Sequence, residues 1–127
     1  MRTDIKPPKC GIEMIKRFES CELAAYPDPD TGGDPWTIGW GDGRPVKQGD
    51  VITAKGADDL FYFWIEKSFW PGVAKIPYFL DMSDEQRGAL LSFAYNLGAD
   101  FYGHPRFTTI SRYLNDKDWE KVPDALV

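Results

Sequence analysis

A stretch rich in proline, aspartate and glycine, residues 26–35, constrains the fold more than any other feature of the sequence. Three prolines, three aspartates and two glycines within ten residues disfavour a helix and favour tight turns. The next six residues, Trp36 to Gly41, combine aromatic and β-branched side chains with glycine, a composition typical of a strand beside a turn. We therefore predict a β-hairpin with a long turn in this part of the chain.

Helical periodicity precedes the hairpin. Ile12, Ile15 and Phe18 recur every three residues and predict the apolar face of a short amphipathic helix. Beyond the hairpin strand, we expect a turn at residues 42–45 and an extended segment at 46–52 that completes a small antiparallel sheet.

The rest of the chain is predicted to be helical. Thr53 is placed to cap a helix that stops at the Trp-Pro-Gly sequence of residues 70–72, and shorter helical pieces are expected at 109–114 and 119–122, before Pro123.

A further helix is expected from the spacing of Ser83 and Gln86, which is that of a capping box. The apolar stripe of this helix would consist of Leu90, Ala94 and Leu97. Gly98 would follow as its left-handed terminal residue.

Composition and charge exclude several classes of protein. With 43% apolar and 15% aromatic residues, the chain can build a core and is not expected to be disordered. Its net charge of −5 disfavours binding to nucleic acid or anionic lipid. The longest apolar run, Leu60 to Ile65, is far shorter than the roughly 20 residues of a membrane span. We expect no nucleic-acid partner, no membrane insertion and, because no apolar segment follows the basic residues near the amino terminus, no secretory signal.

Glu19 contradicts the periodicity of its own helix. It lies four residues after Ile15 and would share the apolar face, where burial raises the pKa of a carboxyl group and suits it to act as a general acid. The alternative is a helix-terminal residue whose charge reaches water. Asp28, in the polar turn, is expected to be ionised and to form a pair of unlike carboxyl groups with Glu19; alternatively, it only stabilises the turn.

We expect no metal and no cofactor. Asp28, Asp30 and Asp34 resemble the start of a calcium-binding loop, but glycines stand where an EF-hand has further oxygen ligands. The two cysteines, with only one histidine in the chain, are expected to be free.

At these residues the sequence resembles the phage-type lysozymes, the T4-lysozyme-like muramidases of glycoside hydrolase family 24. The motifs that carry the resemblance are Arg17-Phe18-Glu19, Ala25-Tyr26-Pro27-Asp28, Trp36-Thr37-Ile38-Gly39-Trp40-Gly41, and the helical block from Gly88 to Gly98. The resemblance implies an α+β, lysozyme-like fold over residues 1–127, with a β-hairpin lobe (about 12–53), a mostly helical lobe (54–127) and an active-site cleft between them. Compared with the family pattern, the helical lobe is short at its carboxyl end.

The resemblance also implies an activity. The enzyme would hydrolyse the β-1,4 bond between N-acetylmuramic acid and N-acetylglucosamine in peptidoglycan, with inversion. Glu19 would be the proton donor, Asp28 the second catalytic carboxylate and Thr37 a group that positions water. Because the turn is long, Asp30 or Asp34 is an alternative second carboxylate. A different class of function, a catalytically inactive peptidoglycan-binding module on the same fold, also fits the sequence.

Tyr95 and Asn96, at the end of the helical block, are expected by the same resemblance to contact sugar. The alternatives are core packing for Tyr95 and helix capping for Asn96. Such an endolysin is expected to be a monomer that accumulates in the host bacterial cytoplasm and reaches the cell wall with the help of a holin.

Overall fold

The computed structural model describes residues 5–41 and 46–122, which form two compact units. One unit consists of residues 16–64, and the other consists of residues 1–15 together with 65–127. The predicted turn at residues 42–45 and the predicted break at Pro123 lie outside the described residues. The described elements are mainly helical, with one small sheet, as expected for an α+β protein.

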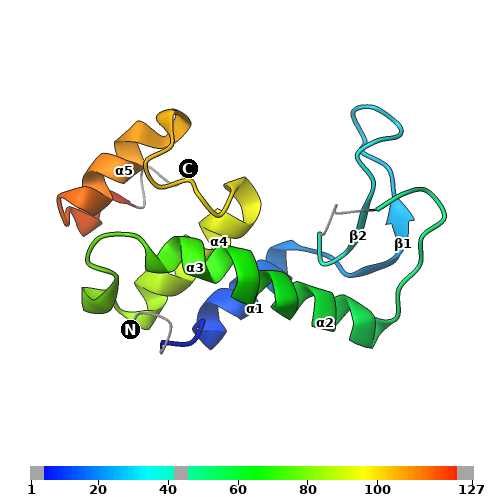
Figure 1. The fold of residues 1–127 in the computed structure, drawn as a ribbon, viewed down its shortest axis with the longest axis horizontal. Helices are drawn as coiled ribbons and strands as arrows, with labels where there is room; N and C mark the ends of the chain where they lie inside the picture. Colours follow the sequence, from blue (N-terminus) through cyan, green and yellow to red (C-terminus); the bar gives the residue numbers. More distant parts are fainter. Residues whose placement is uncertain (1–4, 42–45, 123–127) are drawn as a thin grey trace. The chain divides into compact units, whose positions relative to one another are not determined.

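The sheet of the smaller unit has two antiparallel strands, β1 (Glu22–Tyr26) and β2 (Thr37–Gly39). Tyr26 is opposite Thr37, and Glu22 is opposite Gly39, with an irregularity in β1 between these pairs. Figure 1 shows the two strands joined by the long loop that the sequence predicted.

The predicted third extended segment, residues 46–52, is confirmed only at its end: Val51 forms an antiparallel bridge with Ala24 of β1, with backbone hydrogen bonds from Ala25 N–H to Asp50 O and from Ile52 N–H to Leu23 O. The physical reason is a turn at its start. Lys47 N–H donates to the Asp50 carboxylate at 3.0 Å, and Asp50 N–H donates to the Lys47 carbonyl at 3.1 Å. This turn leaves only the residues after it extended.

Helix α2 (Ala54–Trp64) packs against β2 and forms the core of the smaller unit. The Thr53 hydroxyl accepts a hydrogen bond from Gly56 N–H at 2.9 Å, which confirms the predicted cap. Ala57 and Phe61 on this helix are buried, as is Ile38 on β2.

After Trp64 the chain returns to the larger unit. It first forms a π-helical segment, η2 (Ile65–Phe69), which leads directly into α3 (Trp70–Ala74). The predicted helix stop at residues 70–72 was therefore wrong. Pro71 lies in the first turn of α3, where a missing backbone N–H costs nothing. Gly72 lies so close to the Ala99 carbonyl that a Cβ atom would overlap it.

Helix α4 (Asp84–Leu97) begins with the predicted capping box: Gln86 N–H donates to the Ser83 hydroxyl at 3.1 Å, and Ser83 N–H donates to the Gln86 side chain at 2.8 Å. Leu90 and Ala94 are buried, but Leu97 is 51% exposed and does not belong to the apolar stripe. Gly98 has φ 124° and ψ 140°, so it is not in the left-handed helical conformation predicted for it. The chain leaves α4 extended at this residue.

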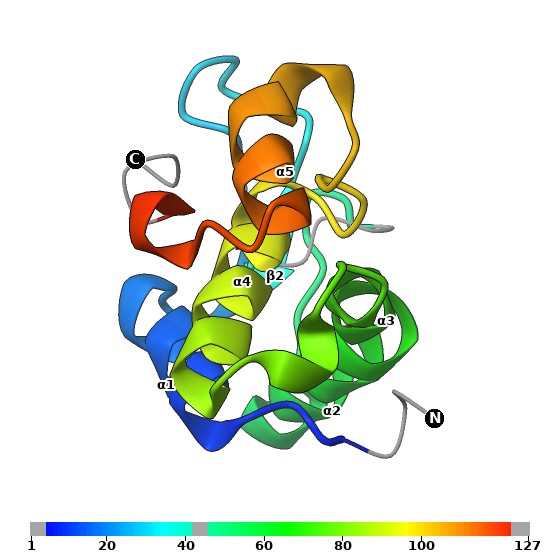
Figure 2. The same ribbon diagram turned by 90° about the vertical axis from the view of Figure 1, so that its left-hand side faces the viewer.

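Helix α1 (Lys9–Phe18) packs against α4 through two glycines. Figure 2 shows α1 beside α4. A Cβ atom on Gly11 would lie 2.7 Å from Gly88 Cα, so the two backbones meet without a side chain between them. Ile12 and Ile15 on α1 are buried as predicted, but Phe18 is 75% exposed, because the helix ends there and the chain turns toward β1.

The remaining described elements are α5 (Thr108–Asn115) and three short 3₁₀ helices, Phe79–Asp81, Pro105–Phe107 and Trp119–Lys121. The predicted helix near residues 109–114 is confirmed, and the piece at 119–122 is a 3₁₀ turn. Among the described residues, no helix is long and apolar enough to cross a membrane.

The contact between α1 and α4 predicts that Gly88→Ala destabilises the protein. Alanine normally stabilises a helix relative to glycine by about 1 kcal/mol, but here the added methyl group would lie 2.9 Å from Gly11 N and 3.0 Å from Cys10 Sγ. We expect a net loss of about 1–3 kcal/mol in the free energy of unfolding, measured by urea titration. Gly33→Ala is the control, because no atom lies within 4 Å of its Cβ position. A Gly88→Ala variant as stable as the wild type would contradict the close contact.

Candidate active site

Glu19 follows the last residue of α1 and is half-buried. Its carboxylate lies against the backbone of Gly41, just after β2: a Cβ atom at Gly41 would be 3.0 Å from Glu19 Oε2. Gly41 also has φ +105°, a conformation that L side chains rarely adopt. The backbone conformation therefore favours glycine at this position, and a side chain here would also displace the Glu19 carboxyl group by a few tenths of an ångström.

Burial raises the pKa of Glu19 above its ordinary value. This is the direction predicted from its position on the apolar face of the first helix. A carboxyl group with a raised pKa keeps its proton to a higher pH than a solvent-exposed glutamate, and so can donate that proton to a leaving oxygen.

Tyr26 is a site residue that sequence reasoning missed. Burial raises the pKa of its phenol, and the negative charge of Glu19 raises it further, while a hydrogen bond with the Thr37 side chain lowers it. The structure thus brings Glu19, Tyr26 and Thr37 together. The signal in the sequence was the hairpin itself, since Tyr26 and Thr37 are opposite each other in its register.

Asp28 lies two residues beyond Tyr26, where the long loop begins. Asp30 N–H donates to Asp28 Oδ1 at 3.0 Å, and the backbone of Asp28 is hydrogen-bonded to Gly32 and Gly33 across the loop. The carboxylate therefore has an oriented position in an Asx turn. Asp30 and Asp34, by contrast, are exposed.

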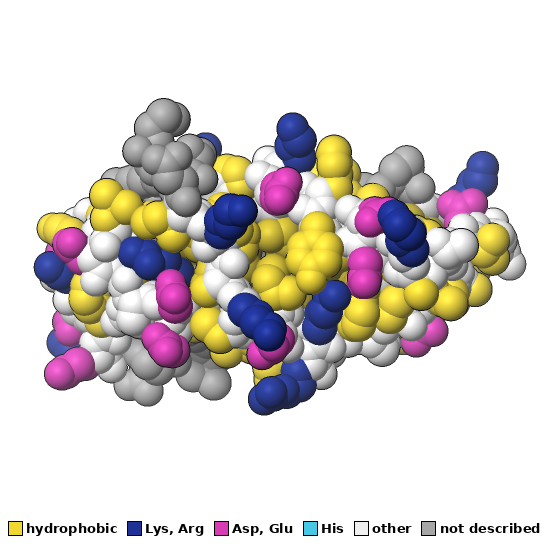
Figure 3. Space-filling model, turned by 90° about the horizontal axis from the view of Figure 1, so that it is seen from below, with side chains coloured by type: hydrophobic (Ala, Val, Ile, Leu, Met, Phe, Trp, Pro, Cys, Tyr) yellow, Lys and Arg dark blue, Asp and Glu magenta, His cyan; other side chains and the backbone are white. Residues whose placement is uncertain are grey.

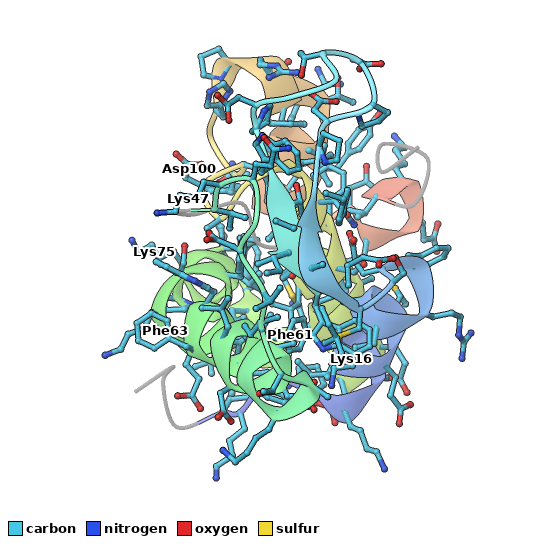
Figure 4. All side chains as sticks on the ribbon, turned by 90° about the vertical axis from the view of Figure 1, so that its right-hand side faces the viewer. Lys16, Lys47, Phe61, Phe63, Lys75 and Asp100 are labelled. Carbon is cyan, nitrogen blue, oxygen red and sulfur yellow. The ribbon has the colours of Figure 1, made fainter. Side chains whose placement is uncertain are left out.

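A cluster around Lys16 joins the last turn of α1, the residues after β2 and helix α2. Its members are Lys16, Trp40, Asp58, Phe61 and Tyr62. The Lys16 amino group lies 3.3 Å from Asp58 Oδ1 and 4.9–5.2 Å from the ring centres of the three aromatic residues. Trp40 Nε1 donates to the same Asp58 oxygen at 2.7 Å. Figure 4 shows Lys16 and Phe61 close together. We call these five residues the Lys16 cluster.

Tyr95 and Asn96 belong to the larger unit, in the last turn of α4. Tyr95 is half-buried, and its ring packs against Phe69 with centres 4.9 Å apart. Asn96 is exposed, and its side-chain amide donates to the Ser92 carbonyl at 3.0 Å. These contacts agree with the packing and helix-end alternatives, and contact with sugar stays a prediction.

Charge is mixed on the surface seen in Figure 3, where acidic and basic side chains are interspersed. Among residues 5–41 and 46–122, no group of three or more histidine, cysteine, aspartate or glutamate side chains is placed to hold a metal ion.

Comparison with known proteins gives a consistent set of relatives. A family model described as phage lysozyme matches residues 16–127. An endolysin of Bacillus phage PZA is 37% identical over 109 residues, 85% of this chain and 40% of that protein. An endolysin of Bacillus phage B103 is 34% identical over 120 residues, 94% of this chain and 43% of that protein. The chain spans about two fifths of the length of these curated relatives.

Two solved structures share the fold. The muramidase domain of SpmX from Asticaccaulis excentricus has a TM-score of 0.74 and 28% identity, over 94% of this chain and 76% of that chain. An endolysin from Escherichia coli O157:H7 phage FAHEc1 has a TM-score of 0.73 and 31% identity, over 95% of this chain and 74% of that chain. These similarities confirm the predicted α+β, lysozyme-like fold.

The raised pKa of Glu19 predicts that Glu19→Gln stabilises the protein near pH 7 but not near pH 4. A glutamate whose pKa is raised by folding contributes its full stability below its ordinary value of 4.5, and this contribution is lost as the pH rises through the raised value. Glutamine has no charge to bury, so the loss disappears. Because Glu19 is only half-buried, we expect a gain below about 1 kcal/mol, measured as a melting temperature across the pH range.

The matched control is Glu13→Gln, on the same helix, whose side chain is 59% exposed. The difference in melting temperature between Glu13→Gln and the wild type should not increase between pH 4 and pH 7, as it should for Glu19→Gln. An equal effect of Glu19→Gln at both pH values would contradict the assigned burial.

Proposed function

Because the chain belongs to the phage lysozyme family, we propose that it hydrolyses bacterial peptidoglycan, with Glu19 as the proton donor. The observation that carries this proposal is the half-buried Glu19 carboxyl group against the backbone of Gly41, where burial raises its pKa. The bond cleaved is the β-1,4 linkage between N-acetylmuramic acid and N-acetylglucosamine.

The proposed reaction uses two carboxyl groups in opposite roles. Glu19 gives its proton to the glycosidic oxygen as the bond to the anomeric carbon breaks. A water molecule attacks the anomeric carbon from the other side of the sugar and gives a proton to Asp28, so that the configuration is inverted. Thr37 holds this water through its hydroxyl group.

The surroundings of the two groups support these roles. Glu19 is half-buried against the backbone of Gly41, and this burial favours the protonated acid. Asp28 accepts a hydrogen bond from the Asp30 backbone N–H, which orients its carboxyl group at the start of the loop. Tyr26 is hydrogen-bonded to Thr37 and lies close enough to sense the charge of Glu19, so it can keep the Thr37 hydroxyl oriented.

Tyr95 and Asn96 complete the proposal as residues that contact the sugar chain. Asn96 is exposed and carries a side-chain amide, which can accept or donate hydrogen bonds to sugar hydroxyl groups. Tyr95 offers an aromatic ring and a hydroxyl group from a half-buried position.

We expect Glu19→Gln to lower the rate of peptidoglycan clearing by at least about 100-fold, because glutamine cannot donate the proton. The measurement is the loss of turbidity of a purified cell-wall suspension, with Glu13→Gln as the control that should clear it like the wild type. Equal clearing by Glu19→Gln would disprove the assignment of the acid. If neither the wild type nor the variant clears the suspension but both sediment with it, the protein is a binding module instead.

Single replacements of the three loop aspartates by asparagine identify the second carboxylate. We expect Asp28→Asn to lower clearing by about 100-fold or more, and Asp30→Asn and Asp34→Asn to have small effects, because only Asp28 is held by the Asx turn beside Tyr26. The melting temperature of each variant shows whether the loop is still folded. A collapse of activity confined to Asp30 or Asp34 would overturn the choice of Asp28.

A further inference from the structure

Two backbone segments place the Glu19 carboxyl group, the end of α1 and the residues after β2, and each of them also carries a member of the Lys16 cluster. Lys16 is three residues before Glu19 on the last turn of α1, and Trp40 directly precedes Gly41. We propose that Lys16, Trp40 and Asp58 are positioning residues for Glu19, which hold the end of α1 and the residues after β2 in the arrangement that sets its carboxyl group against Gly41. This inference rests on the proposed function, in which Glu19 is the acid.

The helix side of the arrangement depends on Lys16. Its side chain is only 24% exposed, whereas a lysine amino group is ordinarily solvated. The positive charge is balanced by Asp58 and lies over the rings of Trp40, Phe61 and Tyr62. The last turn of α1 is thereby attached to α2, which carries Asp58.

The strand side depends on Trp40. Its indole N–H donates to the same Asp58 oxygen that pairs with Lys16. The hydrogen bond to Trp40, followed by the interactions with Lys16, lowers the pKa of Asp58, so this residue remains charged at the pH where the enzyme would work. Asp58 Oδ1 thus connects α1, the helix before Glu19, with the backbone around Gly41 that covers the Glu19 carboxyl group.

A second lysine–aspartate pair provides a matched comparison. Lys55 and Asp59 are 2.7 Å apart on α2, with side chains 84% and 64% exposed, and they lie one turn apart on the same helix. The pair therefore connects no other element to α2. Asp59→Asn removes the same charge from the next position of the same helix as Asp58→Asn does.

The informative variant is Trp40→Phe, which keeps an aromatic ring beside Lys16, removes the N–H donor to Asp58 and changes no charge. If the cluster positions Glu19, the residues after β2 move, water reaches the carboxyl group, and the pKa of Glu19 falls toward its ordinary value. Tyr26, the titratable neighbour of Glu19 on β1, stays protonated throughout this range because its own pKa is raised.

The test compares wild type, Trp40→Phe, Asp58→Asn and Asp59→Asn in two ways. The pKa of Glu19 is measured by carbon NMR of the labelled carboxyl groups, which requires no activity. The values of kcat and KM are measured on soluble peptidoglycan fragments. For Trp40→Phe and Asp58→Asn we expect a lower Glu19 pKa and a kcat reduced by about tenfold, with KM changed by less than about twofold. Asp59→Asn should match the wild type in both measurements.

A cluster that only stabilises the fold would lower the melting temperatures of Trp40→Phe and Asp58→Asn and leave the pKa of Glu19 and kcat unchanged; that result overturns the proposal. A shift of the Glu19 pKa in Asp58→Asn but not in Trp40→Phe would reveal an effect of charge alone and would also overturn it.

The proposed function can fail separately. If the wild type has no hydrolytic activity, and the Glu19 pKa nevertheless shifts in both variants, the positioning stands and the proposed function fails. If Trp40→Phe does not fold, Lys16→Met replaces it: loss of the positive charge alone would raise the Glu19 pKa and overturn the proposal, whereas loss of positioning would lower it.

Discussion

The structure depends on the close approach of two backbones, at Gly11 on α1 and Gly88 on α4, which leaves no space for a side chain between them. This contact determines which face of α1 is buried, and Ile12 and Ile15 follow from it. The same helix carries Lys16 in its last turn and Glu19 immediately after it. Glycine at both positions therefore lets α1, the helix that leads to Glu19, pack directly on the backbone of α4.

The two acidic groups of the site differ because their local backbones differ. Glu19 follows a helix, and a glycine backbone covers part of its carboxyl group without offering a strong ionic partner. Asp28 begins a loop whose backbone folds back on it and donates a hydrogen bond to its side chain. Unlike surroundings for two carboxyl groups are what acid–base cleavage of a glycosidic bond requires. Here, a turn and a helix end supply them without a metal ion in the proposed mechanism.

Local patterns predicted much of the fold and one half of the site. The capping box at Ser83 depends on neighbours in the sequence, so spacing alone indicated it. Helical spacing also indicated that Glu19 is buried, but it did not indicate the Gly41 backbone that covers its carboxyl group. Spacing did not reveal the Lys16 cluster, because its members come from segments around residues 16, 40 and 58 that meet only in the folded chain. The wrong helix stop at Pro71 has another cause: proline ends a helix in its interior but is compatible with a first turn, and the sequence does not distinguish these positions.

The wide helical turn of residues 65–69 determines which side chains reach the core of the larger unit. Ile65 and Trp70 are both buried in the larger unit although they are five residues apart, a separation that places side chains on different faces of a regular α-helix. A π-helical segment, with its bond from residue i to residue i+5, allows both to face the same core. An extra residue at this place is thus accommodated within one turn, and the helices that follow keep their faces.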